Sequence, residues 1–301
     1  MSSINKPMQT FDFLKEAPIN KENLIKQVKK DPLLNKLFKK LKVSDSEIWD
    51  YFNYFIDYKN QIINPNQSPY LFDFKRDSEN KLIIEKKLAH NEKGNRFRLL
   101  NNLLLQHISS PFYDTTLQDL DINDNLYYDL AGIRAEILLS LEPKHQNSNL
   151  LYGVYFHGPA NSYRTKYLSS IANTFALNDI PVAYIDVNQL DEWVKQLIGN
   201  NDDIKYLVNE LSRVPVLILD EIGLKNYTEW FLDTVLVKVL QNRAQNHLLT
   251  YFGSFYPLSA LAKTLIATKK GNVVSAIPKP LIDKIIHLII ELTKVETFIG
   301  V

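Results

Sequence analysis

The stretch "GVYFHGPANSYRTKYLSSIA", residues 153–172, joins an apolar strand end, a polar loop and the start of a helix. This order is the layout of a phosphate-binding loop, whose pattern is G-x-x-x-x-G-K-[ST]. Gly158 and Thr165 fit the pattern, but Tyr163 stands at its second glycine and Arg164 at its lysine. Taken alone, the stretch is compatible with a nucleotide site, with the remnant of one, or with a chance match.

A second stretch, "VPVLILDEIG" at residues 214–223, ends a run of apolar residues with two carboxylates, Asp220 and Glu221. Ligands of open α/β sheets bind at the carboxyl ends of the strands. An aspartate there can hold Mg²⁺, and the adjacent glutamate can orient an attacking water. The plain alternative is a buried strand that ends in a polar turn. Its place about 60 residues after Gly158, ahead of a long helix and the strand at 247–255, favours the functional interpretation.

Apolar strands alternate with helices from residue 150 onward. The strands are expected at residues 150–156, 181–187, 214–222 and 247–255, with a last short one near 295–300. This alternation predicts an α/β fold with a mostly parallel sheet that is covered on both sides. We expect three regions: an N-terminal domain at 1–107, a connector with a lead-in helix at 108–149, and the α/β core at 150–301.

The N-terminal domain is expected to be mainly helical with a β-hairpin. Residues 9–60 have helical spacing of apolar residues, and Asp31-Pro32 should separate two short helices. Ser44 and Glu47 form a capping-box pattern before the next helix. Two strands flank the polar turn Asp77–Asn80, and a helix is expected at about 96–107. The expected apolar core of this domain is aromatic: Tyr51, Phe52, Tyr54, Phe55, Phe72 and Phe74.

The 301 residues carry a formal net charge of +1, which gives no global electrostatic argument for a partner. Residues 1–100, however, hold about six more basic than acidic side chains. Most of that excess comes from Lys21, Lys26, Lys29, Lys30, Lys36, Lys39, Lys40 and Lys42. These lysines are compatible with an ordinary solvated face, with an acidic protein partner, or with single-stranded DNA.

The chain contains no cysteine, which excludes disulfides, thiol catalysis and zinc sites of the cysteine type. The histidines have no metal-ligand spacing, so no zinc is expected; they are His90, His107, His145, His157, His247 and His287. No apolar run approaches the ~18 residues of a membrane span, and the N-terminus lacks the apolar core of a signal peptide. A cytoplasmic protein without membrane contact is therefore expected.

The order and spacing of these motifs resemble the bacterial replicative-helicase loaders, the DnaI/DnaC group of AAA+ ATPases, with the DnaI branch closer. The resemblance runs from about Ile108 to the C-terminus. It rests on four stretches: "SSPFYDTTLQDLDIND" at 109–124, "LYGVYFHGPANSYRTKYLSSIANTFA" at 151–176, "VLILDEIG" at 216–223, and "WFLDTVLVKVLQNRAQNHLLTYFGSFY" at 230–256.

This resemblance implies an AAA+ P-loop-type core that uses ATP and Mg²⁺. The implied ATP-binding residues are Gly158, Pro159, Ala160, Asn161, Ser162, Tyr163, Arg164 and Thr165. The implied Mg²⁺ ligands are Thr165 and Asp220, and the implied catalytic residues are Asp220 and Glu221. Ser254 lies at the sensor-like strand end, and Lys284 stands where an arginine would reach a neighbouring subunit's nucleotide.

The departures from the family pattern gather at this ATP site. Asn161 and Tyr163 replace glycines, and we expect the ring of Tyr163 to obstruct the loop backbone and the approach of phosphate. Arg164 keeps the charge of the lysine but not its shape. Phe255 replaces a terminal asparagine and cannot hydrogen-bond water. These changes imply weak or absent ATP hydrolysis. The DnaI branch also carries an N-terminal zinc module built on cysteines, and this sequence has no cysteine to form one.

The leading hypothesis is a primosomal, helicase-loader-like protein that binds the replicative DNA helicase through its N-terminal region and assists its loading onto DNA. Single-stranded DNA and a second copy of the chain are further candidate partners. One alternative is an active AAA+ ATPase loader with a variant loop. Another is a non-catalytic scaffold of the same fold that serves a different partner.

Overall fold

A computed structural model describes residues 21–108, 112–122, 128–142, 144, 151–159, 162–270 and 273–300. The chain divides into two compact units, 1–95 and 96–301. No described helix has the length and apolar character that crossing a membrane requires. The functional division predicted at residues 107 and 149 stays a prediction.

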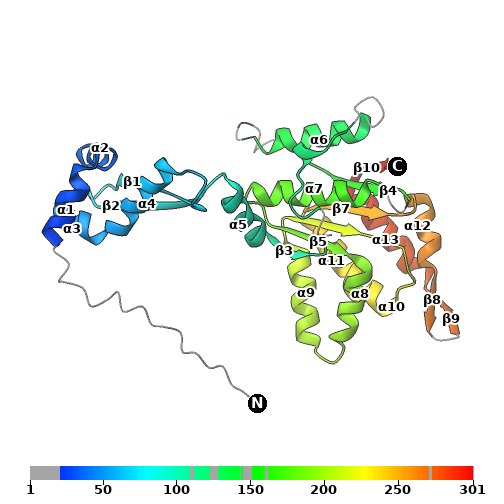
Figure 1. Ribbon diagram of the computed structural model, residues 1–301. Coiled ribbons are helices and arrows are strands. Elements are labelled where there is room, and N and C mark those ends of the chain that lie inside the picture. Colours follow the sequence, from blue (N-terminus) through cyan, green and yellow to red (C-terminus); the bar gives the residue numbers. More distant parts are fainter. Residues whose placement is uncertain are drawn as a thin grey trace, which may run out of the picture. The chain divides into compact units, whose positions relative to one another are not determined.

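The N-terminal unit is mainly helical and contains one antiparallel hairpin, as predicted (Figure 1). Asp31 ends the first helix and caps the second, where its carboxylate accepts from the backbone N–H groups of Leu33 and Leu34. Ser44 and Glu47 form the predicted capping box. The elements are α1 (Lys21–Lys30), α2 (Pro32–Leu41), α3 (Asp45–Asp50), α4 (Phe52–Ile63), β1 (Tyr70–Arg76) and β2 (Leu82–Leu88).

Aromatic side chains form the core of this unit. Phe55 is fully buried, stacks on Phe74 at 4.5 Å between ring centroids and meets Phe38 edge-on at 4.9 Å. Phe72 is also buried, which confirms the predicted aromatic core, but Tyr54 is 43% exposed and lies at its rim. Burial of these rings supplies the apolar area that a small unit needs for stability.

The second unit is built on a six-stranded sheet in the order β10-β4-β7-β6-β5-β3, and every neighbouring pair is parallel. Its strands are β3 (Leu103–Gln106), β4 (Gly153–His157), β5 (Val182–Asp186), β6 (Val216–Asp220), β7 (Leu249–Ser254) and β10 (Thr293–Phe298). A separate short hairpin pairs β8 (Ala267–Lys270) with β9 (Val273–Ala276), and the sequence did not predict it.

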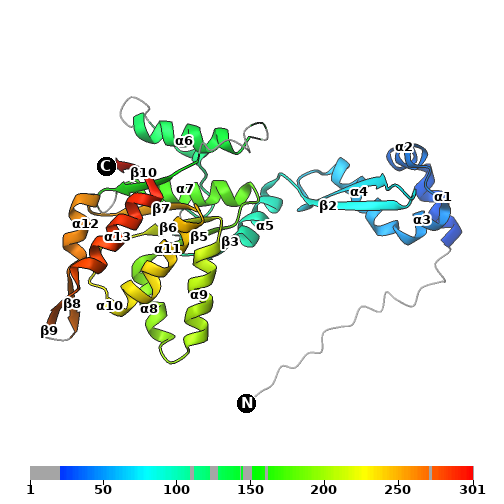
Figure 2. The ribbon, with the colours of Figure 1, turned by 180° about the vertical axis from the view of Figure 1, so that it is seen from behind.

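Helices cover both faces of the sheet, as Figures 1 and 2 show. One face carries α5 (Glu92–Asn102), α6 (Tyr128–Ser140) and α7 (Arg164–Leu177). The other carries α8 (Val187–Gln196), α9 (Asn201–Arg213), α10 (Glu229–Phe231), a π-helical turn (Leu232–Val237), α11 (Lys238–Gln245), α12 (Leu258–Leu265) and α13 (Lys279–Leu292). A short 3₁₀ turn, η3 (Leu117–Asp119), packs against α7.

Alternation along the strands divides the core into two layers. On β4, Val154 and Phe156 pack with α7, whereas Tyr155 packs with the helices on the opposite face. Because successive strand residues point to opposite faces, strands buried on both sides read as continuous apolar runs. This confirms the predicted two-sided α/β sheet.

The predicted helix at 96–107 is wrong in its last turn. The helix ends at Asn102, and Leu103–Gln106 form the edge strand β3, which pairs in parallel with β5. The four residues "LLLQ" carry no local signal that distinguishes a helix end from a strand. Pairing with β5, more than 70 residues away in sequence, decides their conformation.

Candidate functional site

The loop at 158–163 lies between the end of β4 and the start of α7, where a phosphate-binding loop was predicted. Gly158 donates its N–H to the carbonyl of Ser254 at 3.1 Å. A Cβ on Gly158 would lie 2.0 Å from the carbonyl oxygen of Ile299, so close backbone packing requires a glycine there. Ala160 and Asn161, both predicted to contact ATP, lie outside the described residues. Pro159 is exposed.

Tyr163 does not distort the loop as the sequence led us to expect. Its φ and ψ are −66° and 0°, values that any residue adopts, and its side chain is 48% exposed. Lys166 lies over its ring, 4.7 Å from the centroid, and donates to its hydroxyl at 3.3 Å. The glycine of the pattern is therefore not required by the backbone here, and the ring points out of the loop.

The centre of the site is filled by Arg164, the first residue of α7. Its side chain is only 2% exposed, although it stands at the loop position that normally carries a phosphate-binding lysine. Its Nη1 donates to the carbonyl oxygens of Gly158 and Ser254, both at 2.8 Å. The guanidinium also lies over the ring of Phe255, with Cζ 4.6 Å from the centroid. Arg164 thus turns inward and is held from three segments of the chain.

The same guanidinium pairs with both predicted catalytic carboxylates. Nε of Arg164 lies 3.2 Å from Oδ1 of Asp220, and Nη2 donates to Oε1 of Glu221. A buried charge is tolerated when it is paired and its remaining hydrogen-bonding positions are satisfied. Arg164 meets both conditions with two carboxylates and two backbone carbonyls.

Asp220 is saturated by protein donors. Its Oδ1 accepts from Nε of Arg164 and from the backbone N–H of Glu221 at 2.9 Å. Its Oδ2 accepts from the hydroxyls of Thr165 at 3.1 Å and Tyr184 at 2.6 Å. A carboxylate offers about four lone-pair positions, and all four are used. In this arrangement Asp220 has none left for a metal ion.

Tyr184 is a site residue that the sequence analysis missed. It lies on β5, and burial together with the charge of Asp220 raises the pKa of its hydroxyl well above the ordinary value. The hydroxyl therefore stays protonated and donates to Asp220. A buried tyrosine almost always finds a hydrogen-bond partner, so the tyrosine within the apolar run "PVAYIDV" was the available signal.

Glu221 is held in an unusual environment. Its φ is +63°, in the left-handed region that few non-glycine residues adopt. Burial, and then the charge of Asp220, raise the pKa of its carboxyl to about 7, against the opposing effect of Arg164. Its Oε2 is buried with no hydrogen-bond partner among the described residues. Strained and perturbed residues of this kind gather at functional sites.

The side chains of the other two predicted residues, Ser254 and Lys284, do not bond to Arg164, Asp220 or Glu221. The hydroxyl of Ser254 donates to the carbonyl of Ile222 at 2.8 Å and accepts from the N–H of Tyr256 at 3.1 Å, so it closes a turn. Lys284 is exposed on α13 and has no ion pair within the described part of the chain. No group of three or more metal-ligating side chains is found among the described residues.

ATP and Mg²⁺ would need unpaired binding groups at Arg164, Thr165 and Asp220. The lysine position is occupied by a guanidinium that is already committed to protein acceptors. The hydroxyl of Thr165 and both oxygens of Asp220 bond to one another or to neighbouring side chains. The arrangement does not fit the nucleotide and its metal, because their binding groups are bonded to each other.

The chain matches no family model. It is 26% identical over 184 residues to the replicative helicase loader DnaI of Bacillus subtilis (strain 168), which covers 60% of this chain and 57% of that protein. It is 26% identical over 104 residues to the replicative helicase loader DnaC of Buchnera aphidicola subsp. Baizongia pistaciae (strain Bp), covering 34% and 42%. The chain spans about half the length of the curated relatives it matches.

Among solved structures, a crystal structure of DnaI is 24% identical with a TM-score of 0.49, and covers 65% of this chain and 95% of the solved one. The parallel sheet, the loop after β4 and the paired carboxylates at the end of β6 have the layout of an α/β core of the P-loop type. Within that class, the sequence matches are to replicative helicase loaders. Over the matched residues, the chain is therefore similar to helicase loaders of the DnaI and DnaC type.

Proposed function

We propose that this protein acts as a helicase-loader-type primosomal protein whose AAA+ core neither binds nor hydrolyses ATP to a significant extent. It binds the replicative DNA helicase and assists its loading onto DNA. Sequence similarity to the helicase loaders DnaI and DnaC supports the loader role. The observation that carries the absence of hydrolysis is the buried guanidinium of Arg164, which occupies the phosphate-side position and neutralises Asp220 and Glu221.

The geometry supports a structural role for the altered ATP site. In a working nucleotide site, phosphate and metal connect the loop to the ends of the neighbouring strands. Here the guanidinium of Arg164 makes those connections, since it bonds to Gly158 after β4, to Asp220 at the end of β6 and to Ser254 at the end of β7. The core is therefore held in one arrangement without nucleotide.

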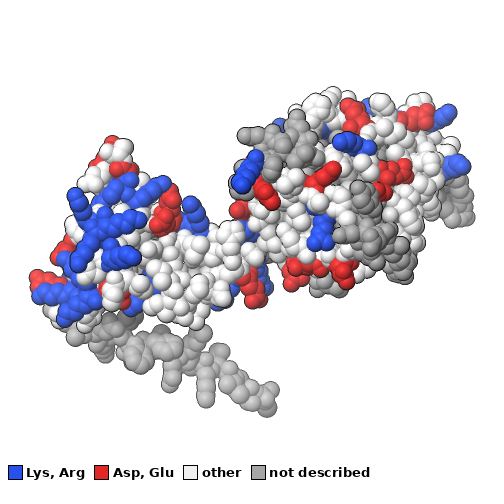
Figure 3. All heavy atoms as spheres, turned by 90° about the horizontal axis from the view of Figure 1, so that it is seen from above, with Lys and Arg blue, Asp and Glu red and all other residues white. Residues whose placement is uncertain are grey.

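The N-terminal unit is our candidate for the helicase contact. Its lysines on α1 and α2 are exposed, whereas most apolar residues of the same helices are buried in the unit's own core, namely Ile25, Val28, Leu34, Leu37 and Phe38. Figure 3 shows these basic side chains gathered on the N-terminal unit. A surface of this kind attracts an acidic partner and makes binding dependent on ionic strength.

The deciding experiment is co-purification of the full chain with the replicative helicase of the same organism, with and without ATP. We expect a complex whose yield does not depend on ATP, and which weakens when Lys26 and Lys30 are both changed to Glu. The matched control is the same charge reversal at Lys238 and Lys263 on the AAA+ unit. If the two proteins do not associate at micromolar concentration, the loader role is contradicted. If they associate only when ATP is present, the loader role stands, but the proposal that the core works without nucleotide is contradicted.

A further inference from the structure

The second unit also contains a surface cavity that Arg164 and its partners do not line. This cavity of about 420 Å³ opens between β3, α8 and α9. Its volume lies in the range of ~300–1,000 Å³ that is usual for ligand pockets. The lining is mostly apolar and includes Leu104 and Leu105 of β3 and Trp193 of α8, with Asp203, Tyr206 and Glu210 from α9.

We propose that this cavity is a docking groove for a basic amphipathic helix of a partner protein. The proposal is independent of the helicase-loader role, because it rests on the surface of the groove alone. Three observations carry it: apolar side chains left exposed at the mouth, the edge position of β3, and the placement of two carboxylates along α9.

The mouth of the cavity presents large apolar side chains to solvent. Leu104 on β3 is 50% exposed and Tyr206 on α9 is 67% exposed. The pairing of β3 with β5 shifts register between Leu103 and Leu105, and both Leu104 and Leu105 line the same cavity. Such irregularities re-aim side chains that strict alternation would send to opposite faces. Large apolar side chains exposed beside an apolar cavity favour a binding site over an ordinary surface.

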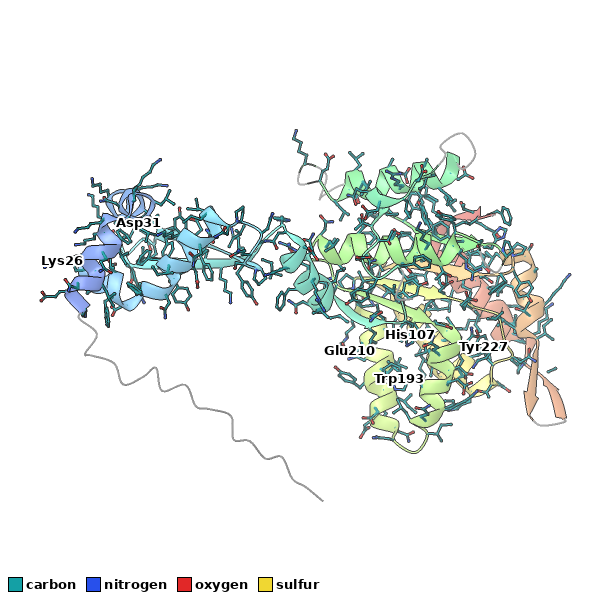
Figure 4. All side chains as sticks on the ribbon, in the orientation of Figure 1. Lys26, Asp31, His107, Trp193, Glu210 and Tyr227 are labelled. Carbon is teal, nitrogen blue, oxygen red and sulfur yellow. The ribbon has the colours of Figure 1, made fainter. Side chains whose placement is uncertain are left out.

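β3 is an edge strand, with β5 as its one neighbour in the six-stranded sheet. The cavity beside it is flanked by Trp193 from α8 and Glu210 from α9, which Figure 4 labels. The groove therefore has an apolar floor and two helical walls. That is the geometry in which an amphipathic helix buries anchors at positions i, i+3, i+4 and i+7.

The charge at the groove selects the class of partner. Asp203 and Glu210 are seven residues apart on α9, so they lie on one face, about 10 Å apart along the axis. Neither makes an ion pair within the part of the chain that the structure describes. Two basic residues seven apart on a facing helix would meet both carboxylates. Nucleic acid is disfavoured here, because its phosphates would be repelled.

The test uses the full chain and a fluorescently labelled, alanine-based peptide with lysine every seventh residue and leucine at the third and fourth positions after each lysine. Fluorescence anisotropy should show binding in the micromolar range. The matched peptide with glutamate in place of each lysine should bind at least about tenfold more weakly. Equal binding of the two peptides, or no binding of the lysine peptide, would overturn the proposal.

Two pairs of variants locate the contact. Leu104→Asp and Glu210→Lys should each weaken binding about tenfold or more. Their controls, Ile290→Asp and Glu291→Lys, place the same changes at exposed positions on α13 and should leave binding unchanged. Because Leu104 is half-exposed, its variant should fold. Sedimentation velocity checks the competing occupant: a dimer that Leu104→Asp abolishes would assign the groove to a second copy and overturn the proposal.

Discussion

The guanidinium of Arg164 and the carbonyl oxygen of Ser254 lie 2.8 Å apart, so the first turn of α7 is bonded to the end of β7. The two residues are 90 positions apart in the chain. Through the same side chain α7 is also connected to β6, where Asp220 and Glu221 accept from Nε and Nη2. The loop position that binds phosphate in nucleotide-binding proteins here carries a side chain that links the carboxyl ends of neighbouring strands.

Arg164→Ala should destabilise the protein strongly. The substitution leaves Asp220 and Glu221 buried without their cation, and removing one partner of a buried pair costs about 3–5 kcal/mol. Urea denaturation followed by circular dichroism measures the change in the free energy of unfolding. The neighbouring Lys166→Ala serves as control, because Lys166 is only partly buried and contacts the exposed Tyr163; it should stay within about 0.5 kcal/mol of the parent protein.

Arg164→Lys should raise affinity for nucleotide. An ammonium group cannot bond simultaneously to Gly158, Ser254 and both carboxylates, so the Thr165 and Asp220 oxygens become available again. Titration with a fluorescent ATP analogue and Mg²⁺ measures the effect. We expect no saturable binding by the parent protein at micromolar concentrations and measurable binding by the variant.

The same titration can refute the interpretation of the site. Parent protein that binds the analogue as tightly as Arg164→Lys, and releases phosphate in a manner that Glu221→Gln abolishes, would show a working ATPase. Tyr163→Gly is the companion control. Because the ring of Tyr163 points outward and its backbone is unstrained, this change alone should not restore binding.

Glu221 should make stability depend on pH between about 4.5 and 7. Burial raises the pKa of its carboxyl to about 7 in the folded protein, above the ordinary value of 4.5. In that window the folded state holds a proton that the unfolded state has released, so the free energy of unfolding falls as pH rises. The loss contributed by this group is on the order of 3 kcal/mol, from about 1.4 kcal/mol for each unit of pKa difference. Below the window its contribution is fully present.

Urea denaturation at about pH 5 and pH 8 measures this dependence. The parent protein should lose more stability between the two values than Glu221→Gln, whose amide does not titrate. Glu85 provides a contrasting control, because hydrogen bonding and ion pairing with Lys75 lower rather than raise the pKa of its carboxyl. An identical pH dependence in the parent and in Glu221→Gln would contradict the assignment.

Gly253→Ala should destabilise the site without removing any charged group. A Cβ there would lie 2.0 Å from Oδ1 of Asp220 and 2.7 Å from Cδ1 of Leu168, so both must move. We expect a loss of about 1–3 kcal/mol, the usual cost of overpacking. Thermal unfolding measures it. Gly132→Ala on α6 is the opposite case, because nothing lies within 4 Å of its Cβ; it should stabilise by about 0.4–1 kcal/mol.

Much of the architecture could be predicted because it is written in local patterns. The break at Asp31-Pro32, the capping box at Ser44 and the alternation of apolar strands with helices each depend on residues close in sequence. The β3 strand could not be predicted in this way. Its four residues acquire their conformation from β5, and no local signal records that pairing.

The candidate site shows the same division. Arg164, Thr165, Asp220 and Glu221 were identified from motif spacing, and the structure brings them together. The sequence assigned an obstruction to the ring of Tyr163, whereas in the structure that ring is exposed and the guanidinium of Arg164 fills the centre of the site. Tyr184 was missed because its role depends on the adjacency of β5 and β6.

The sequence by itself determined the class of fold, the position of the altered loop and the identity of the charged residues, because these follow from periodicity, spacing and residue type. Only the tertiary structure decided that Arg164 points inward and bonds to three strand ends. The physical reason is that a buried charge takes the orientation in which it is fully paired, and its partners Gly158, Asp220 and Ser254 meet only when the sheet has formed.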